Sequence, residues 1–165
     1  MTLAEFRKDK DEVFKVDEHS PIPAEKRKAF SGLVYYPENP ALNFILDLDL
    51  QVAHEEVIMD TSTGDSRVLK RAGKIYFTVN GEAAELSIFQ DASGYFLPFR
   101  DATNGSETYG AGRYVEVEEE HGKFRIDFNK AYNPYCAYNP YYSCPIPPRE
   151  NWLQVRIEAG EKKYT

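Results

Sequence analysis

The chain has 165 residues, a length that suits one domain, because domains cluster at about 100–150 residues. The hydrophobic fraction of 42% and the 12 tyrosines and 10 phenylalanines are enough for one core. A balance of 20 basic against 27 acidic residues gives a net charge of −7, which disfavours nucleic-acid binding, because affinity for phosphate comes from clustered Lys and Arg. No apolar run approaches the ~18 residues of a membrane span and no signal-peptide pattern follows Met1, so we expect a cytoplasmic protein without a membrane partner.

The first 32 residues are predicted to form a helical N-terminal cap. Residues 2–15 place apolar side chains among charges at helical spacing, and Thr2 with Glu5 forms a capping-box pattern. A second short helix is predicted over Pro23–Phe30, with Gly32 as its C-terminal stop.

From Phe44 onwards the hydrophobic pattern has period two, which indicates strands with one buried face. The predicted strands are Phe44–Gln51, Glu56–Thr61, Val68–Arg71, Lys74–Val79, Ala84–Phe89, Tyr95–Phe99, Arg113–Val117, Phe124–Phe128 and Leu153–Ile157. Turn-forming pairs such as Asn80-Gly81 separate them, because both residues tolerate positive φ. The fold class is therefore mainly β, a single antiparallel barrel or sandwich.

The whole chain is predicted to be one domain. After the cap at 1–32 and the antiparallel strands at 44–128, residues 129–151 form a long, ordered, Tyr/Pro-rich loop, and residues 152–165 form a final strand and tail.

The segment 98–114 is dense in chemical groups. Arg100 and Arg113 lie close in sequence to Asp101 and Glu107, with Tyr109 between them. Such a network either binds an anion or holds one carboxylate at a shifted pKa, but ordinary ion pairs around a hairpin give the same pattern. Gly110-Ala-Gly112 is no dinucleotide fingerprint, because the third glycine is missing.

The segment 132–148 repeats Tyr-Asn-Pro-Tyr at 132–135 and 138–141, and half of the chain's ten prolines lie within it. Each Pro fixes its own φ and biases the preceding Asn away from the helical region, so the segment is stiff. Long ordered loops are often lids or binding loops, and a plug that closes one end of the strands is the structural alternative.

Cys136 and Cys144 lie within this segment. Their spacing does not match zinc ligands, which leaves buried free thiols, a disulfide, or a reactive or ligating cysteine as open alternatives. The three histidines are scattered without an HExxH pattern, so no metal site is predicted. No P-loop and no GxSxG elbow occur either, and no cofactor is predicted.

At these two segments the chain resembles the domain of unknown function family 1684, a family of uncharacterised bacterial and archaeal proteins. The resemblance rests on the stretches 98–114 and 127–138, on Cys144-Pro-Ile-Pro-Pro, on Glu150-Asn151, and on Ala159-Gly-Glu161. Weaker similarity around Ser20-Pro21 and at 30–36 extends it over nearly the whole chain. It implies a stand-alone β-rich domain and brings no reaction with it.

The function itself is not determined by the sequence, and three hypotheses remain. The leading one is a small-molecule-binding protein whose pocket lies between 98–114 and 132–148, with an arginine holding an anionic group. The others are an enzyme that uses carboxylate or thiol chemistry in the same pocket, and a protein-interaction module built on the Tyr/Pro loop. The oligomeric state stays open. Candidate ligand-binding residues are Arg100, Asp101, Glu107, Tyr109, Arg113, Asn129, Tyr132, Asn133, Tyr138 and Glu150.

Overall fold

The chain combines one N-terminal helix with eight strands, and the computed structural model describes residues 1–164. The elements are α1 (Leu3–Val16), β1 (Asn43–Leu46), β2 (Glu56–Asp60), β3 (Ser66–Val79), β4 (Glu82–Asp91), β5 (Gly94–Phe99), β6 (Arg113–Val115), β7 (Glu118–Glu120) and β8 (Lys123–Asp127). Short 3₁₀ turns lie at Ala24–Ala29, Pro40–Leu42, Phe128–Lys130, Tyr135–Ala137 and Arg149–Asn151.

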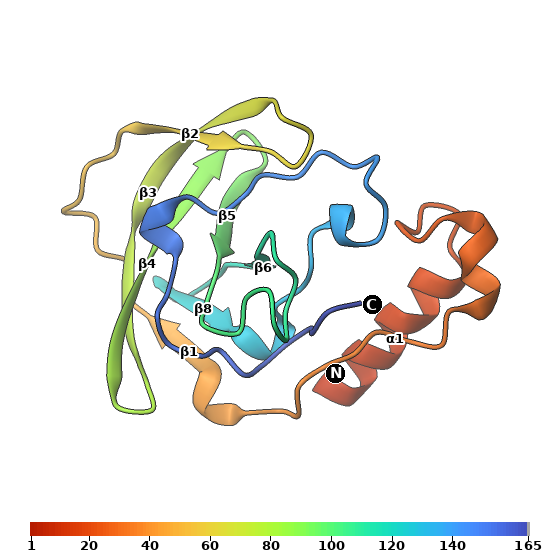
Figure 1. Cartoon of the computed structure of the whole chain (residues 1–165). Coiled ribbons are helices and arrows are strands. Elements are labelled where there is room, and N and C mark those ends of the chain that lie inside the picture. Colours follow the sequence, from red (N-terminus) through yellow and green to blue (C-terminus); the bar gives the residue numbers. More distant parts are fainter. Residues whose placement is uncertain (165) are drawn as a thin grey trace.

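The strands form two antiparallel sheets, which confirms the mainly β fold class (Figure 1). One sheet has the order β2-β3-β4-β5-β6, and the other has the order β1-β8-β7. All strand pairs are antiparallel, and within residues 1–164 the two sheets do not close into one barrel. The arrangement is therefore a sandwich.

Turn chemistry sets the connections between strands. Asn80 and Gly81 both have positive φ, of 50° and 82°, and join β3 to β4 in the tight hairpin that the sequence predicts. The two strands predicted over 68–79 are one long strand, β3, interrupted by a register shift between Arg71 and Gly73. At that bulge only glycine fits, because a Cβ on Gly73 would lie 2.7 Å from the carbonyl oxygen of Asp49.

The main core lies between the two sheets. It contains Ile75, Phe77, Leu86, Ile88, Leu97, Phe99, Ile126 and Phe128, together with Val155, Ile157 and Ala159 from the C-terminal segment. Phe77 and Phe99 both meet the ring of Phe128, with ring centroids 5.5 and 5.4 Å apart. The C-terminal segment is thus part of the core and not a loose tail.

The helical cap differs in part from the prediction. Thr2 and Glu5 form the predicted capping box at the start of α1. The second predicted helix is a short 3₁₀ turn, Ala24–Ala29. Helix α1 lies to one side of the sheets, and the start of residues 132–148, called the Tyr/Pro segment from here on, lies between them (Figure 1). Phe14 of α1 packs edge-on against Tyr138 of this segment at a centroid distance of 5.3 Å.

The predicted strand over 153–157 is wrong. The segment is extended and its side chains alternate between buried and exposed, as in a strand. The hydrogen-bond partners of its backbone, however, are a loop and side chains. Ala102 N–H donates to Val155 O at 2.9 Å, and Ile157 N–H donates to a carboxylate oxygen of Asp101 at 2.6 Å. No ladder forms there, so period-two burial arises without a strand.

Residues 129–151 cross the molecule in irregular backbone that is fixed at both ends. Tyr132 exchanges two backbone hydrogen bonds with Tyr114 of β6, of 2.8 and 2.9 Å, and Pro145 pairs with Thr61 after β2. Within residues 1–164, α1 is too short and too charged to span a membrane, and the structure contains no longer helix.

Candidate functional site

Arg113, a candidate anion ligand in the sequence, is a fully buried clamp on the C-terminal segment. Its side chain is 1% exposed, and its guanidinium donates to the carbonyl oxygens of Ile157 at 2.9 Å, Ala159 at 2.5 Å and Glu161 at 3.2 Å. Burial lowers the pKa of the guanidinium, and the nearby carboxylate of Asp101 counteracts this shift. With its donors used by the chain itself, Arg113 is a structural residue.

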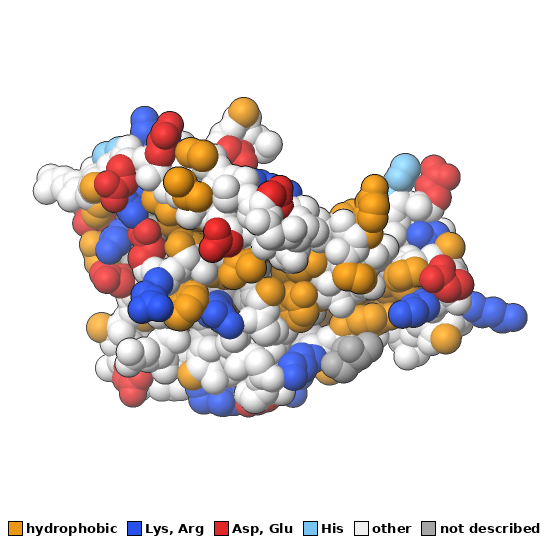
Figure 2. All heavy atoms as spheres, turned by 45° about the horizontal axis from the view of Figure 1, so that its top comes forward, with side chains coloured by type: hydrophobic (Ala, Val, Ile, Leu, Met, Phe, Trp, Pro, Cys, Tyr) orange, Lys and Arg blue, Asp and Glu red, His pale blue; other side chains and the backbone are white. Residues whose placement is uncertain are grey.

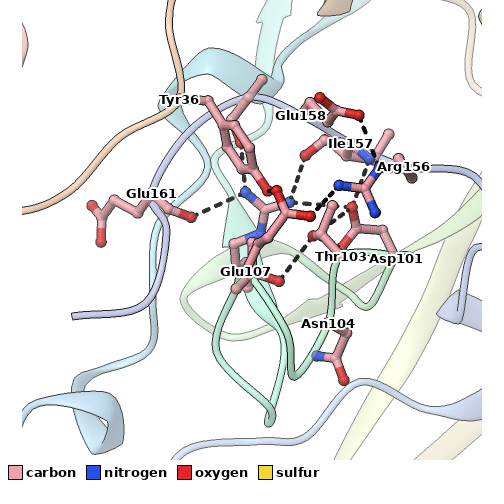
Figure 3. A network of polar contacts seen from close by, with 12 residues as sticks. Tyr36, Asp101, Thr103, Asn104, Glu107, Arg156, Ile157, Glu158 and Glu161 are labelled. Atoms are coloured by element: carbon pink, nitrogen blue, oxygen red, sulfur yellow. Dashed lines mark hydrogen bonds and ion pairs between the residues drawn. The ribbon is translucent and has the colours of Figure 1, made fainter. Parts of the chain in front are cut away.

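Asp101 completes this clamp (Figure 3). One of its carboxylate oxygens lies 3.5 Å from Arg113 Nη2 and accepts the backbone N–H of Ile157 at 2.6 Å. Thr103 Oγ1 donates to both carboxylate oxygens, at 2.7 and 2.9 Å. The buried pair is therefore satisfied by hydrogen bonds on both sides, as a stable buried ion pair requires.

Glu107 lies at the surface beside this clamp. Tyr36 Oη donates to its carboxylate at 3.0 Å, and Arg156 donates to the other oxygen. The hydrogen bond from Arg156, followed by that from Tyr36, lowers the pKa of Glu107, while burial and the same bond raise the pKa of Tyr36 to about 12. The contacts attach the 98–114 loop to the C-terminal segment.

Two further candidates, Arg100 and Glu150, also have structural partners. Arg100 donates to Gly110 O at 2.8 Å and stacks over the ring of Trp152 at 4.7 Å. Glu150 accepts two bonds from Arg71, of 2.9 and 2.6 Å, and one from Ser87 at 2.5 Å. Burial raises the pKa of Glu150, but the hydrogen bonds from Arg71 and Ser87 outweigh it, and the net pKa is lowered.

The remaining polar candidates join loops to each other. Asn129 holds the backbone of Asn39, accepting its N–H at 2.7 Å and donating to its carbonyl at 2.9 Å. Tyr138 Oη donates to the buried carboxylate of Glu161 at 2.6 Å, and the backbone N–H of Asn133 donates to the same oxygen at 3.1 Å. Lys10 of α1 pairs with the other oxygen of Glu161. Sequence reasoning missed this buried network because its members lie at opposite ends of the chain.

A cleft of about 1060 Å³ lies between α1, the Tyr/Pro segment and strands β3, β5 and β6 of the five-stranded sheet. Figure 2 shows one face of the molecule, on which hydrophobic side chains gather where the surface is hollowed between the sheets and the helical end. Its apolar lining comes from Phe6, Val13 and Phe14 of α1, from Val68, Leu69, Tyr95 and Phe96 of the sheet, from Tyr114, and from Tyr132, Pro134, Tyr135, Tyr142, Cys144 and Pro145. Charged side chains also line it, namely Asp9, Lys10, Arg67, Asp91, Glu116, Glu118 and Lys130.

Aromatic rings line this cleft in two groups. Tyr114 meets Phe96 and Tyr132 edge to face, at centroid distances of 4.8 and 5.7 Å. Tyr135 and Tyr142 meet in the same way at 5.2 Å. Burial raises the pKa of the Tyr114 and Tyr132 hydroxyls, so both phenols stay neutral and can donate.

Polar groups lie among these rings. Tyr132 Oη donates to Glu116 at 2.8 Å, and Lys10 Nζ lies 5.1 Å from the centre of the Tyr132 ring. Lys130 Nζ lies 5.1 Å from the ring of Phe6. A mostly apolar cleft with a few polar groups around it is the usual composition of a small-molecule site.

Both cysteines lie at this cleft. Cys144 lines it, and Cys136 lies behind Cys144, with the Tyr109 hydroxyl 3.4 Å from its sulfur. Both thiols are free, and a hydrogen bond between them is the largest cause of their pKa shifts. Within residues 1–164, no cluster of three or more His, Cys, Asp or Glu side chains is arranged to hold a metal ion.

Only Tyr132 and Cys144 of the residues chosen from the sequence line this cleft. The pocket expected between 98–114 and 132–148 therefore differs from the cleft observed, to which 98–114 contributes Tyr114 alone. The signal that could have indicated the cleft is a set of exposed apolar side chains. Val68 is 57% exposed and Tyr95 is 40% exposed. In a period-two strand pattern both occupy the outward face, where polar residues are expected.

Comparisons with known proteins identify relatives without a known activity. A family model described as protein of unknown function (DUF1684) matches residues 28–162. The solution NMR structure of an uncharacterized protein from Haloarcula marismortui is 34% identical, with a TM-score of 0.70, and the match covers 97% of this chain and 91% of that chain. None of the curated proteins matches the chain.

Proposed function

Because the chain belongs to the DUF1684 family, whose function is unknown, we propose its function from the cleft: it binds a small, mostly apolar molecule between α1, the Tyr/Pro segment and the five-stranded sheet. The observation that carries this proposal is the volume of about 1060 Å³ together with its aromatic lining. Ligand clefts usually measure about 300–1,000 Å³ and are lined by hydrophobic and aromatic side chains.

The side chains that line the cleft indicate the class of ligand. The rings of Tyr95 and Tyr135, which are 40% and 42% exposed, leave ring faces and edges available to a flat apolar body. Lys130 and the hydroxyls of Tyr95 and Tyr142 supply polar contacts that orient it. The two arginines that the sequence suggested as anion ligands, Arg100 and Arg113, both bind carbonyl groups of the chain itself, so the proposed ligand is chiefly apolar.

Exposed apolar side chains at the cleft add support. Val13, Val68, Tyr95 and Tyr135 are all exposed although they are large and apolar, and all four line the cleft. Soluble chains rarely gather such side chains at one place without a partner for them. A cytoplasmic location is proposed with this function, and the two free thiols support it, because disulfides are rare in that compartment.

Fluorescence titration with anilinonaphthalene sulfonate, a flat apolar dye with one charged group, tests the proposal. The cleft should bind the dye saturably, and Tyr95→Ala should weaken it about 2- to 12-fold, because one aromatic contact is worth about 0.5–1.5 kcal/mol. Tyr76→Ala is the matched control: Tyr76 also lies exposed on a strand but does not line the cleft. Equal effects of the two substitutions would contradict the proposal.

A second candidate is a protein-interaction surface on the same segment, which Tyr141 favours because it is 87% exposed. Tyr141 does not line the cleft, so the two functions separate. Tyr141→Ala should leave dye binding unchanged under the ligand proposal. Protection of residues 132–135, which include the cleft-lining Tyr132 and Tyr135, from hydrogen exchange on adding the dye would favour the cleft. Unprotected exchange of residues 139–142 without any dye binding would favour the interaction surface.

A further inference from the structure

Cys136 and Cys144 are brought together by two separate attachments. Cys144 is fixed beside β2: its backbone N–H donates to Ser62 Oγ at 3.1 Å, and its carbonyl accepts the backbone N–H of Ser62 at 3.0 Å. Cys136 lies in the 3₁₀ turn Tyr135–Ala137, and the Tyr109 hydroxyl donates to its sulfur at 3.4 Å. The chain between the two cysteines therefore closes a small loop whose ends are held by different parts of the fold.

The groups that face the two sulfurs are mostly neutral hydrogen-bond donors. They are the hydroxyls of Tyr109 and Ser62 and the backbone N–H groups of the 3₁₀ turn, with the Tyr114 phenol also close. Two charged groups contact Ser143, the residue before Cys144: Arg67 donates to Ser143 O at 2.6 Å, and Asp65 accepts from Ser143 Oγ at 3.1 Å.

These donors favour one negative charge on the pair. The hydrogen bond from the Cys144 thiol, opposed by burial and aided by the Tyr109 and Ser62 hydroxyls, lowers the pKa of Cys136 to about 6. The same bond raises the pKa of Cys144. The opposite shifts favour the thiolate on Cys136 and the proton on Cys144.

The two cysteines differ in exposure to the cleft. Cys144 is half-buried and lines the cleft, whereas Cys136 is 9% exposed behind it. A reagent that enters the cleft meets Cys144 first. One sulfur thus faces solvent and its partner lies directly behind it. In such an arrangement the second sulfur can convert a mixed disulfide on the first into an internal disulfide.

We propose that Cys136 and Cys144 are a thiol–disulfide exchange site whose substrate is a small-molecule disulfide entering through the cleft. Cys144 passes its proton to the Cys136 thiolate while its sulfur attacks the substrate, which breaks the substrate S–S bond and releases one thiolate. That thiolate takes the proton from Cys136, whose sulfur then attacks Cys144 and expels the second thiolate. The substrate gains two electrons and becomes one thiol and one thiolate, and the protein gains one disulfide.

The exchange also changes the cleft, because Ser143, Cys144 and Pro145 form part of its wall. An internal disulfide would close the loop between residues 136 and 144 and fix that wall. The exchange itself needs no ligand of the kind proposed above, so the two proposals fail or succeed separately.

Oxidised glutathione tests the exchange on the reduced protein. The intact mass should fall by two hydrogen atoms, and each protein molecule should release two molecules of reduced glutathione. Cys136→Ser should instead keep one glutathione as a stable mixed disulfide on Cys144. A wild-type protein that stays reduced, or that keeps glutathione on its cysteines without forming the internal disulfide, would overturn the proposal.

The pH profile separates a paired site from two ordinary thiols, and needs no cysteine substitution. The wild-type rate should level off above about pH 6–7, whereas ordinary thiols keep gaining rate up to about pH 8.5. Tyr109→Phe removes the hydroxyl donor and should move the wild-type midpoint upward. A profile that follows ordinary thiols in the wild type, or one that Tyr109→Phe does not move, would contradict the pairing. Tyr132→Phe is the control, because its hydroxyl donates to Glu116 and not to a sulfur.

Discussion

Replacing Arg113 by methionine tests how the C-terminal segment is held in the core. The substitution keeps the apolar stem but removes three donors to backbone carbonyls and leaves Asp101 as a buried carboxylate without its cation. Breaking a buried pair on one side costs about 3–5 kcal/mol. For a chain of this size each kcal/mol lowers Tm by about 2–4 °C, so we expect a fall of about 6–20 °C.

Thermal and guanidinium unfolding, followed by circular dichroism, measures this loss. Arg100→Met is the matched control, because Arg100 also lies over an aromatic ring and also donates to a carbonyl, but at the surface. Arg100→Met should lower the free energy of unfolding by only about 0.5–1.5 kcal/mol. The double variant Arg113→Met with Asp101→Asn should lose at least about 0.5 kcal/mol less than the sum of the single variants, since it buries no unpaired charge. If Arg113→Met is as mild as Arg100→Met, the clamp is not what holds the segment.

Two other changes test the backbone and the tyrosines. Gly160→Ala should destabilise the fold by about 1–3 kcal/mol, because φ is +77° and the new Cβ would lie 2.7 Å from Ala131 O. Gly64→Ala is the control, because Gly64 also has positive φ but has open space around it, so this substitution should destabilise the fold clearly less. Equal losses of stability would refute the steric argument. Stability should fall as pH rises from about 10 to 12, because the pKa of Tyr36 is raised to about 12 and that of Tyr138 is also raised, so the unfolded chain loses these protons first. Urea midpoints across this range should decline less steeply in Tyr138→Phe, and an unchanged slope would contradict the assignment.

Local signals in the sequence predicted the elements well. The Thr2–Glu5 capping box and the Asn80-Gly81 hairpin are both present, because each depends on residues within one turn of the chain. The strand predicted at 153–157 failed for a physical reason. Burial alternates there, but the partners of the backbone are the side chains of Asp101 and Arg113, which lie some 40 to 60 positions away in the sequence.

The polar candidates show the same limit. A buried network and a ligand site contain the same residue types, and sequence spacing does not distinguish a donor that points at a ligand from one that points at a carbonyl. Arg113 illustrates this, since all the carbonyl groups to which it donates belong to the last residues of the chain. The cleft wall contributed by α1 was likewise not predictable, because nothing local says that the helix faces Tyr132 across the cleft.

Amide NMR titration with anilinonaphthalene sulfonate tests the central claim, a ligand site in the cleft, most directly. A ligand in the cleft should cause saturable shifts both in α1, at Val13 and Phe14, and in the sheet, at Tyr95 and Phe96. All of these shifts should fit one dissociation constant. Shifts confined to residues 139–142, or shifts that do not saturate, would contradict the claim.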